Sequence, residues 1–281
     1  MSEDKTLADI PLGASGRSAL DVAKDAALQA GKLMADRFYE TKEISYKGPG
    51  DVVTDVDKAA EELLRGILAK EFPDMGFLGE ESAGDRADQG YVWIVDPVDG
   101  TRNYAAGIPF VSLVIGLALD GEVLVGVNYD PLVKEMFYAE RGQGAYLNDS
   151  RIYVTENTNL SEGVLGMDLS YGHEGTMQGL DIVRSFWPAL WSLRIMGSSA
   201  LGLSYAAAGR YDLFFHGGLS PWDQVAGMLL VEEAGGVVTD RHGKRATLYS
   251  DGIIASNKTL HSDFLHRTDG MEWRKPTRAT V

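Results

Sequence analysis

The chain has 281 residues, of which 44% are hydrophobic and 24% charged, proportions that are ordinary for a soluble protein with a substantial core. Its 26 basic and 41 acidic residues give a net charge of −15, which argues against nonspecific binding to nucleic acid or to an anionic membrane, because both need a basic face. The absence of cysteine excludes disulfides, thiolate nucleophiles and cysteine-ligated zinc, and is compatible with a reducing cytoplasm.

The first half of the chain is expected to combine helices with an antiparallel sheet. Residues 1–15 are expected to be a loose leader. Residues 1–14 lack the basic start and the apolar stretch of a secretory signal, so none is expected. Apolar residues at helical spacing predict helices over 18–37 and 57–72, and residues 47–50 are a loop signal. Asp120 and Gly121 predict a hairpin between two strands. The expected strands cover residues 77–78, 91–95, 111–119, 123–130, 136–139 and 144–147.

The second half alternates more regularly between strand and helix patterns. We expect one α/β domain of mixed layers over residues 16–270, with halves at about 16–150 and 151–270 and a tail at 271–281. No uninterrupted apolar run approaches the ~20 residues that span a bilayer, so we expect a soluble, cytoplasmic protein. The expected strands are 164–167, 193–196, 211–215, 237–238 and 252–255, and the expected helices are 177–187, 198–208 and 222–234.

The clearest chemical signal lies between Trp93 and Tyr104. An apolar strand leads into Asp96 and Asp99, and Pro97 is predicted to stop the strand ladder and to hold a rigid bend. Carboxylates that converge from a stiff strand end suit a hard cation. The following Gly100 permits close backbone approach, and amides at a helix start favour phosphate. The stretch predicts a metal beside a phosphate, and therefore phosphoryl chemistry.

Three other acidic motifs each have an ordinary explanation. The aspartates between Asp51 and Asp57 stand where a helix begins and would serve as capping residues. Glu80 and Glu81 follow a short strand and could belong to a solvated loop. Asp223 follows a serine and a proline in the pattern of a helix start. Taken one at a time, these motifs do not establish a site.

Together the acids point to a metal centre. They follow strands or open helices, so they can converge on one cleft edge, where without cations they would repel one another. Several carboxylates that share two or three Mg²⁺ ions fit two-metal phosphoryl transfer. The sequence has no zinc-type histidine spacing, no G-x-S-x-G elbow and no Walker A loop. The acids concerned are Glu80, Asp96, Asp99 and Asp223.

In order and spacing, these motifs resemble the inositol monophosphatase family, within the fructose-1,6-bisphosphatase-like fold, across roughly residues 17–260. The resemblance implies a layered αβαβα sandwich and Mg²⁺-dependent hydrolysis of a small phosphate monoester, inositol 1-phosphate or a related polyol or sugar phosphate. It also implies a homodimer and inhibition by lithium. The motifs that carry it are residues 51–57, 79–82, 93–103, 197–200, 222–227 and 233–236.

The same resemblance assigns ligands to two or three Mg²⁺ ions. Glu80, Asp96 and the backbone carbonyl of Val98 would hold the first ion. Asp96, Asp99 and Asp223 would hold the second, and Glu80 with waters would contribute to a third. The second ion would stabilise the leaving alkoxide in a direct in-line hydrolysis without a covalent intermediate.

The resemblance also assigns the water-activating pair and the phosphate site. Asp57 and Thr101 would orient and deprotonate the attacking water, with Glu80 as a further catalytic group. The amides of Gly100 and Thr101 would bind phosphate, and Asp51 and Lys47 would have supporting roles.

Gly197, Ser198 and Ser199 are expected to line the leaving-group pocket. Inositol-hydrolysing members typically carry a glutamate seven residues before the metal aspartate, where this chain has His216. This histidine would either bond a substrate hydroxyl or be a satisfied histidine at a strand end. The difference leaves fructose 1,6-bisphosphate and histidinol phosphate open as substrates. The alternative of another class is a non-catalytic regulator that acts through protein partners.

Overall fold

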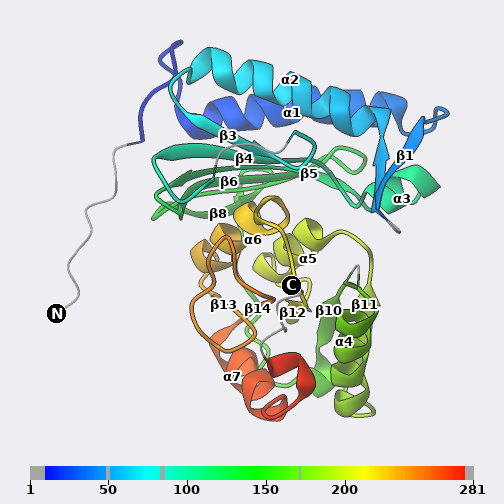
Figure 1. Ribbon diagram of the computed structural model, residues 1–281. Coiled ribbons are helices and arrows are strands. Elements are labelled where there is room, and N and C mark those ends of the chain that lie inside the picture. Colours follow the sequence, from blue (N-terminus) through cyan, green and yellow to red (C-terminus); the bar gives the residue numbers. More distant parts are fainter. Residues whose placement is uncertain (1–9, 49–50, 83–85, 171, 276–281) are drawn as a thin grey trace.

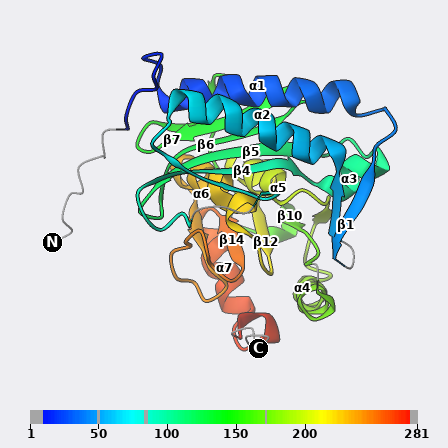
Figure 2. The same cartoon turned by 45° about the horizontal axis from the view of Figure 1, so that its top comes forward.

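The structure is a computed structural model that describes residues 10–48, 51–82, 86–170 and 172–275. These residues form stacked layers of helix and sheet (Figure 1). The outermost layer consists of α1 (Ala19–Arg37) and α2 (Asp55–Glu71), which lie side by side over one face of a sheet (Figure 2). Residues 1–9 of the expected leader, residues 49–50 of the expected loop and residues 276–281 of the expected tail lie outside the described residues.

The second layer is a seven-stranded sheet in the order β3-β4-β5-β6-β7-β8-β9, antiparallel except for the β3–β4 pair. Its side chains alternate between two apolar interfaces, as the pleat requires. In β4, Trp93 and Val95 pack under α1 and α2, whereas Val92 and Ile94 face the opposite layer. The strands are β3 (Gly76–Gly79), β4 (Tyr91–Asp99), β5 (Ser112–Leu119), β6 (Glu122–Asp130), β7 (Glu135–Glu140), β8 (Gly144–Leu147) and β9 (Ser150–Arg151).

The remaining layers belong to the second half of the chain. The helices α5 (Ser199–Ala207) and α6 (Pro221–Glu233) lie between the two sheets, and α4 (His173–Phe186) and α7 (Lys258–Arg267) cover the outer face of a five-stranded sheet (Figure 1). This arrangement confirms the predicted layered αβαβα sandwich. The sheet has the order β11-β10-β12-β14-β13, formed by β10 (Val164–Met167), β11 (Ser192–Ile195), β12 (Leu213–His216), β13 (Val237–Thr239) and β14 (Ile253–Ser256).

The middle helices pack unusually close to the seven-stranded sheet. A Cβ atom at Gly126 would lie 2.8 Å from the Cα of Ala226, and one at Gly116 would lie 2.3 Å from a methyl carbon of Val225. Glycine at these two positions therefore lets the backbone of α6 approach the sheet. This contact fixes the start of α6 relative to the end of β4, where the candidate site lies.

Several elements differ from the sequence predictions. The hairpin of β1 (Ile44–Gly48) and β2 (Asp51–Thr54) was not predicted, because the residues of β1 are almost all exposed and show no apolar alternation. The helix α7 has a polar composition, and it too was not predicted. The prediction that Pro97 ends the strand was wrong. The strand β4 continues to Asp99, although its pairing with β5 shifts register between Asp96 and Asp99.

Both ends of the described chain are held by specific contacts. The backbone N–H groups of Ala14 and Ser15 donate to the backbone carbonyl and the side chain of Glu71 at the end of α2. Within the stretch expected to be a tail, residues 272–274 form a short 3₁₀ turn that buries Trp273. Over the described residues, no helix combines the length and the apolar character that crossing a bilayer demands.

Candidate active site

Two aspartates reach the site from the irregular end of β4. Three residue steps from Asp96 to Asp99 face two steps from Val114 to Ser112 on β5, which is a β-bulge. Asp96 Oδ1 accepts the backbone N–H of Val98 at 2.9 Å, which closes a tight turn around the proline. The bulge brings both carboxylates to the same cavity, and both are buried.

The third aspartate comes from the start of α6. Asp223 Oδ2 accepts the backbone N–H of Ser220 at 2.7 Å, and the two residues form a capping box with a proline at the first helical turn. Asp223, Asp96 and Asp99 each present a carboxylate oxygen within 4.8 Å of the others. The capping interpretation is therefore correct, and the same residue also joins the acid cluster, which we define as Glu80, Asp96, Asp99 and Asp223.

Charge repulsion and burial strongly perturb this cluster. Burial and the neighbouring carboxylates raise the pKa of Asp96 and of Asp223 well above the ordinary range. Burial also raises the pKa of Asp99 to about 7, against hydrogen bonds from Ser198 and the backbone of Ala200. Hard oxygen donors held this closely fit a divalent cation such as Mg²⁺.

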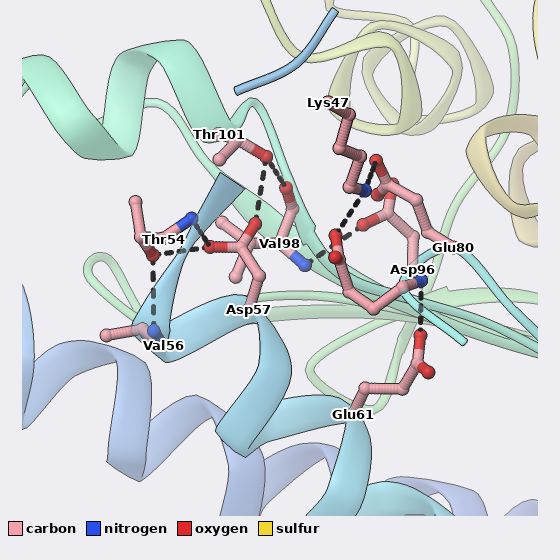
Figure 3. Close-up of polar contacts among 10 residues, drawn as sticks. Lys47, Thr54, Val56, Asp57, Glu61, Glu80, Asp96, Val98 and Thr101 are labelled. Atoms are coloured by element: carbon pink, nitrogen blue, oxygen red, sulfur yellow. Dashed lines mark hydrogen bonds and ion pairs between the residues drawn. The ribbon is translucent and has the colours of Figure 1, made fainter. Parts of the chain in front are cut away.

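Glu80 lies at the edge of the cluster, directly after β3. Lys47 Nζ lies 3.2 Å from Glu80 Oε1 and 2.6 Å from Glu81 Oε1, so the β1–β2 hairpin is tied to the site (Figure 3). Burial alone would lower the pKa of Lys47, but its bonds to Glu81 and Glu80 raise it instead. Burial raises the pKa of Glu80, while the lysine opposes that shift. The backbone of Glu81 is held in turn by Glu61 of α2, at 2.8 Å.

The predicted water-activating pair is assembled from α2 and from the first residue of the short helix α3 (Thr101–Ala106), which follows β4. Thr101 Oγ1 lies 3.1 Å from Asp57 Oδ1 and 2.8 Å from the carbonyl oxygen of Val98, as Figure 3 shows. Asp57 Oδ2 accepts the backbone N–H of Thr54 at 3.0 Å and also its hydroxyl, which completes the cap of α2. Burial raises the pKa of Asp57 to about 7. This carboxylate is therefore poised to exchange a proton near neutral pH.

A cavity of about 280 Å³ opens beside the cluster. Gly100 has a φ of +87°, and a Cβ atom there would lie 3.0 Å from the carbonyl oxygen of Gly197. Ser198 was predicted to line the leaving-group pocket, but it lies beneath the cavity surface, where its hydroxyl donates to Asp99 and caps α5. Of the other predicted site residues, all but Asp57 line the cavity: Glu80, Asp96, Val98, Asp99, Gly100, Thr101, Gly197, Ser199, His216 and Asp223.

His216 is buried at the end of β12 and lines the cavity. Its Nδ1 accepts the backbone N–H of Gly218 at 3.1 Å, and a backbone hydrogen bond also joins the ring to Leu169. Burial lowers the pKa of His216 to about 4, so the ring is neutral near pH 7. These contacts match the description of a satisfied histidine at a strand end.

Sequence reasoning missed one carboxylate in the cavity wall. Asp168 directly follows β10, is 7% exposed, and lines the same cavity as the acid cluster, where its charge helps to raise the pKa of Asp99. It follows a buried apolar strand, which is the signal that had identified Asp96. At Asp168 this signal is weaker, because no second acid follows within three residues.

Comparisons with known proteins agree with this geometry. The sequence profile described as the inositol monophosphatase family matches residues 17–270. The chain is 40% identical over 256 residues to an inositol-1-monophosphatase of Mesorhizobium japonicum, covering 89% of this chain and 96% of the relative. It is 39% identical over 243 residues to the Nus factor SuhB of Escherichia coli K12, covering 85% and 91%.

A solved structure extends the agreement to the fold. The extragenic suppressor protein suhB of Bartonella henselae superposes with a TM-score of 0.85 at 36% sequence identity, over 89% of this chain and 98% of that one. The predicted family is thus confirmed by sequence and by structure. The chain belongs to the inositol monophosphatase family, a family of phosphoric monoester hydrolases.

Proposed function

We propose that this protein hydrolyses a small phosphate monoester in a Mg²⁺-dependent reaction. The observation that carries the proposal is the convergence of Asp96, Asp99 and Asp223, whose oxygens lie within 4.8 Å of one another in a buried wall of the cavity. These residues, with Glu80 and the Val98 carbonyl, would hold two to three Mg²⁺ ions. When bound, Mg²⁺ lowers the pKa of a coordinated water and neutralises charge on the phosphate and the leaving oxygen.

The residues beside the metal ligands would manage the proton and the nucleophile. Thr101 Oγ1 can accept a hydrogen bond from the attacking water while it donates to Asp57, which lies 3.1 Å away. Asp57, with its pKa raised to about 7, would take up the proton that the water loses. Glu80, at the edge of the acid cluster, would act as a further catalytic group beside the attacking water.

The phosphate and the alcohol would occupy the remaining cavity. The N–H groups of Gly100 and Thr101 are proposed to bind phosphate oxygens, because the positive φ of Gly100 turns the chain toward the cavity. Gly197 and Ser199 would line the side that holds the alcohol. We propose inositol 1-phosphate or a related polyol or sugar phosphate as substrate, with fructose 1,6-bisphosphate and histidinol phosphate as the alternatives.

Phosphate release from inositol 1-phosphate, measured with and without Mg²⁺ and with added lithium, tests the proposal. Asp96→Asn is expected to lower kcat at least ~100-fold, because it removes a charge from a ligand shared between metals. A matched control is Asp130→Asn, since Asp130 is a buried aspartate at the end of β6 that accepts two backbone N–H groups, an interaction that asparagine preserves. Full activity of Asp96→Asn, or activity that survives complete metal removal, would refute the assignment.

A role through protein partners is the second candidate. The SuhB relative is named a Nus factor, and Trp187 and Trp191 are 65% and 67% exposed beside α4, which leaves aromatic surface available for contact. We propose that the partner at this surface is a second copy of the chain, in a homodimer such as the family resemblance implies. We also propose that the protein works in a reducing cytoplasm. Light scattering on the wild type and on a Trp187→Ser, Trp191→Ser double variant tests the dimer. If the double variant has the same molar mass as the wild type, this use of the surface is contradicted.

A further inference from the structure

The unassigned carboxylate Asp168 stands where α/β sheets bind ligands. Its neighbour Met167 pairs with Ile195 of β11 and with Phe215 of β12, so Asp168 lies in line with Met196 and His216 at the carboxyl ends of three parallel strands. Ligands of open α/β sheets characteristically bind outside these strand ends. Asp168 also lines the cavity that the acid cluster borders.

The hydrogen bonds of Asp168 leave acceptor capacity toward the cavity. Its Oδ1 accepts the backbone N–H groups of Met196 at 2.9 Å and of Gly197 at 2.6 Å. The backbone N–H of Ser198 adds a third favourable contact with the carboxylate. An ionised carboxylate offers about four lone-pair sites on two oxygens. At least one site therefore remains for a donor that enters the cavity.

The neighbouring groups at these strand ends cannot take that role. The ring of His216 is neutral and is already bonded to the backbone of Gly218 and of Leu169. The side chains of Leu169, Ile195 and Met196 are apolar, and each is more than a third exposed at the cavity. Among the cavity-lining residues that the structure describes, Asp168 is the one carboxylate outside the acid cluster.

We propose that Asp168 accepts a hydrogen bond from a hydroxyl of the alcohol leaving group and thereby selects phosphate esters of polyols. The inference rests on the proposed phosphomonoesterase activity. An alcohol without a hydroxyl at this point would leave the remaining acceptor site of the buried carboxylate without a donor, and a site built for a hydroxyl rejects an analogue that lacks it. The negative charge also disfavours a leaving group that carries a second phosphate on this side, as fructose 1,6-bisphosphate does. Asp168 thus takes the hydroxyl-binding role that was one of the two alternatives for His216.

A pair of substrates that differ only in hydroxyls tests the assignment. Inositol 1-phosphate and cyclohexyl phosphate share a six-membered ring, but the second has no hydroxyl. In Asp168→Asn, the side-chain carbonyl still accepts the N–H groups of Met196 and Gly197, while an amide donor replaces the free acceptor. We expect kcat/KM for inositol 1-phosphate to fall about 10- to 100-fold, and that for cyclohexyl phosphate to stay within about twofold.

The control is Asp212→Asn, because Asp212 holds the backbone N–H of Val164 at 2.6 Å in the same sheet but does not line the cavity. It should leave both rates unchanged. An equal loss with both substrates in Asp168→Asn would mean that the residue only supports the turn at Gly197, and would overturn the proposal. No loss with either substrate would overturn it as well.

A binding measurement separates this inference from the proposed function. Saturation-transfer NMR with free myo-inositol, in the presence of Mg²⁺ and inorganic phosphate, reports the alcohol site without turnover. Loss of the inositol signal in Asp168→Asn, but not in Asp212→Asn, supports the role of Asp168 even if the wild type releases phosphate from neither ester. Equal inositol binding by wild type and Asp168→Asn would overturn it, whereas an inactive wild type alone would count against the proposed function.

Discussion

Replacing Asp57 by asparagine is expected to remove activity and yet to stabilise the metal-free protein at pH 8. Burial raises the pKa of Asp57 from its ordinary value of 3.8 to about 7. The folded state therefore binds this proton more tightly than the unfolded state does. The stability that the protonated group contributes is complete below pH 3.8 and is lost as the pH rises through 7.

The size of the effect follows from that shift. Roughly three pKa units correspond to about 4 kcal/mol of unfolding free energy lost by the wild type above pH 7. Asparagine is neutral at every pH and avoids this loss. However, its amide must face a hydroxyl or N–H donor of Thr54 or Thr101, which costs about 2 kcal/mol. The net gain should be about 2 kcal/mol at pH 8 and close to zero at pH 5.

Urea unfolding in EDTA at pH 5, 6, 7 and 8 measures this gain directly. Asp55→Asn is the matched control, since Asp55 lies two residues earlier in the first turn of α2, is more exposed, and pairs with Arg37 at 2.7 Å. That variant should lose up to ~1 kcal/mol of stability at pH 8 and gain none. The reasoning fails if Asp57→Asn is less stable than the wild type at pH 8, or if its gain does not shrink toward pH 5.

Two further predictions concern packing and metal binding. Gly126→Ala should lower the free energy of unfolding by about 3 kcal/mol, because its Cβ meets the α6 backbone, whereas Gly66→Ala, with nothing within 4 Å in α2, should raise it by about 0.5–1 kcal/mol. Urea titrations check both signs, and a stable Gly126→Ala variant would contradict the close contact. Mg²⁺ at about 100 times its Kd should raise the Tm by about 5–10 °C at pH 8 and by less at pH 6, where Asp99, with its pKa raised to about 7, is largely protonated. Scanning fluorimetry with NaCl at matched ionic strength is the control, and an equal shift with NaCl would argue against a specific site.

The parts of the site that local sequence patterns could predict are those that lie at ends of regular elements. Asp96 and Asp99 follow an apolar strand, and Asp223 stands in a helix-start pattern, so each position could be read from its neighbours. Their convergence could be anticipated only from the combination and from the family resemblance. The structure brings the three together within 4.8 Å, as expected.

What could not be predicted depends on contacts between distant segments. The role of Ser198 is set by Asp99, which lies 99 positions earlier in the chain. The ring of His216 is hydrogen-bonded to backbone groups of Gly218 and Leu169, and no periodicity in the sequence reveals these contacts. The strand β1 shows no apolar alternation, because it is held by pairing with β2 and by the ion pairs of Lys47. In each case the determining partner is invisible to a local window.

The bulge at the end of β4 and the close packing of α6 against the seven-stranded sheet have a joint consequence for fragments of this protein. Asp96 and Asp99 come from the first half of the chain, whereas Asp223 and the strand-end wall at Asp168 come from the second. Neither half, produced alone, would contain a complete centre. Phosphatase activity restored by mixing two complementary fragments would therefore show that the sandwich has reassembled. Activity can thus serve as a measure of whether the two halves of the chain pack together correctly.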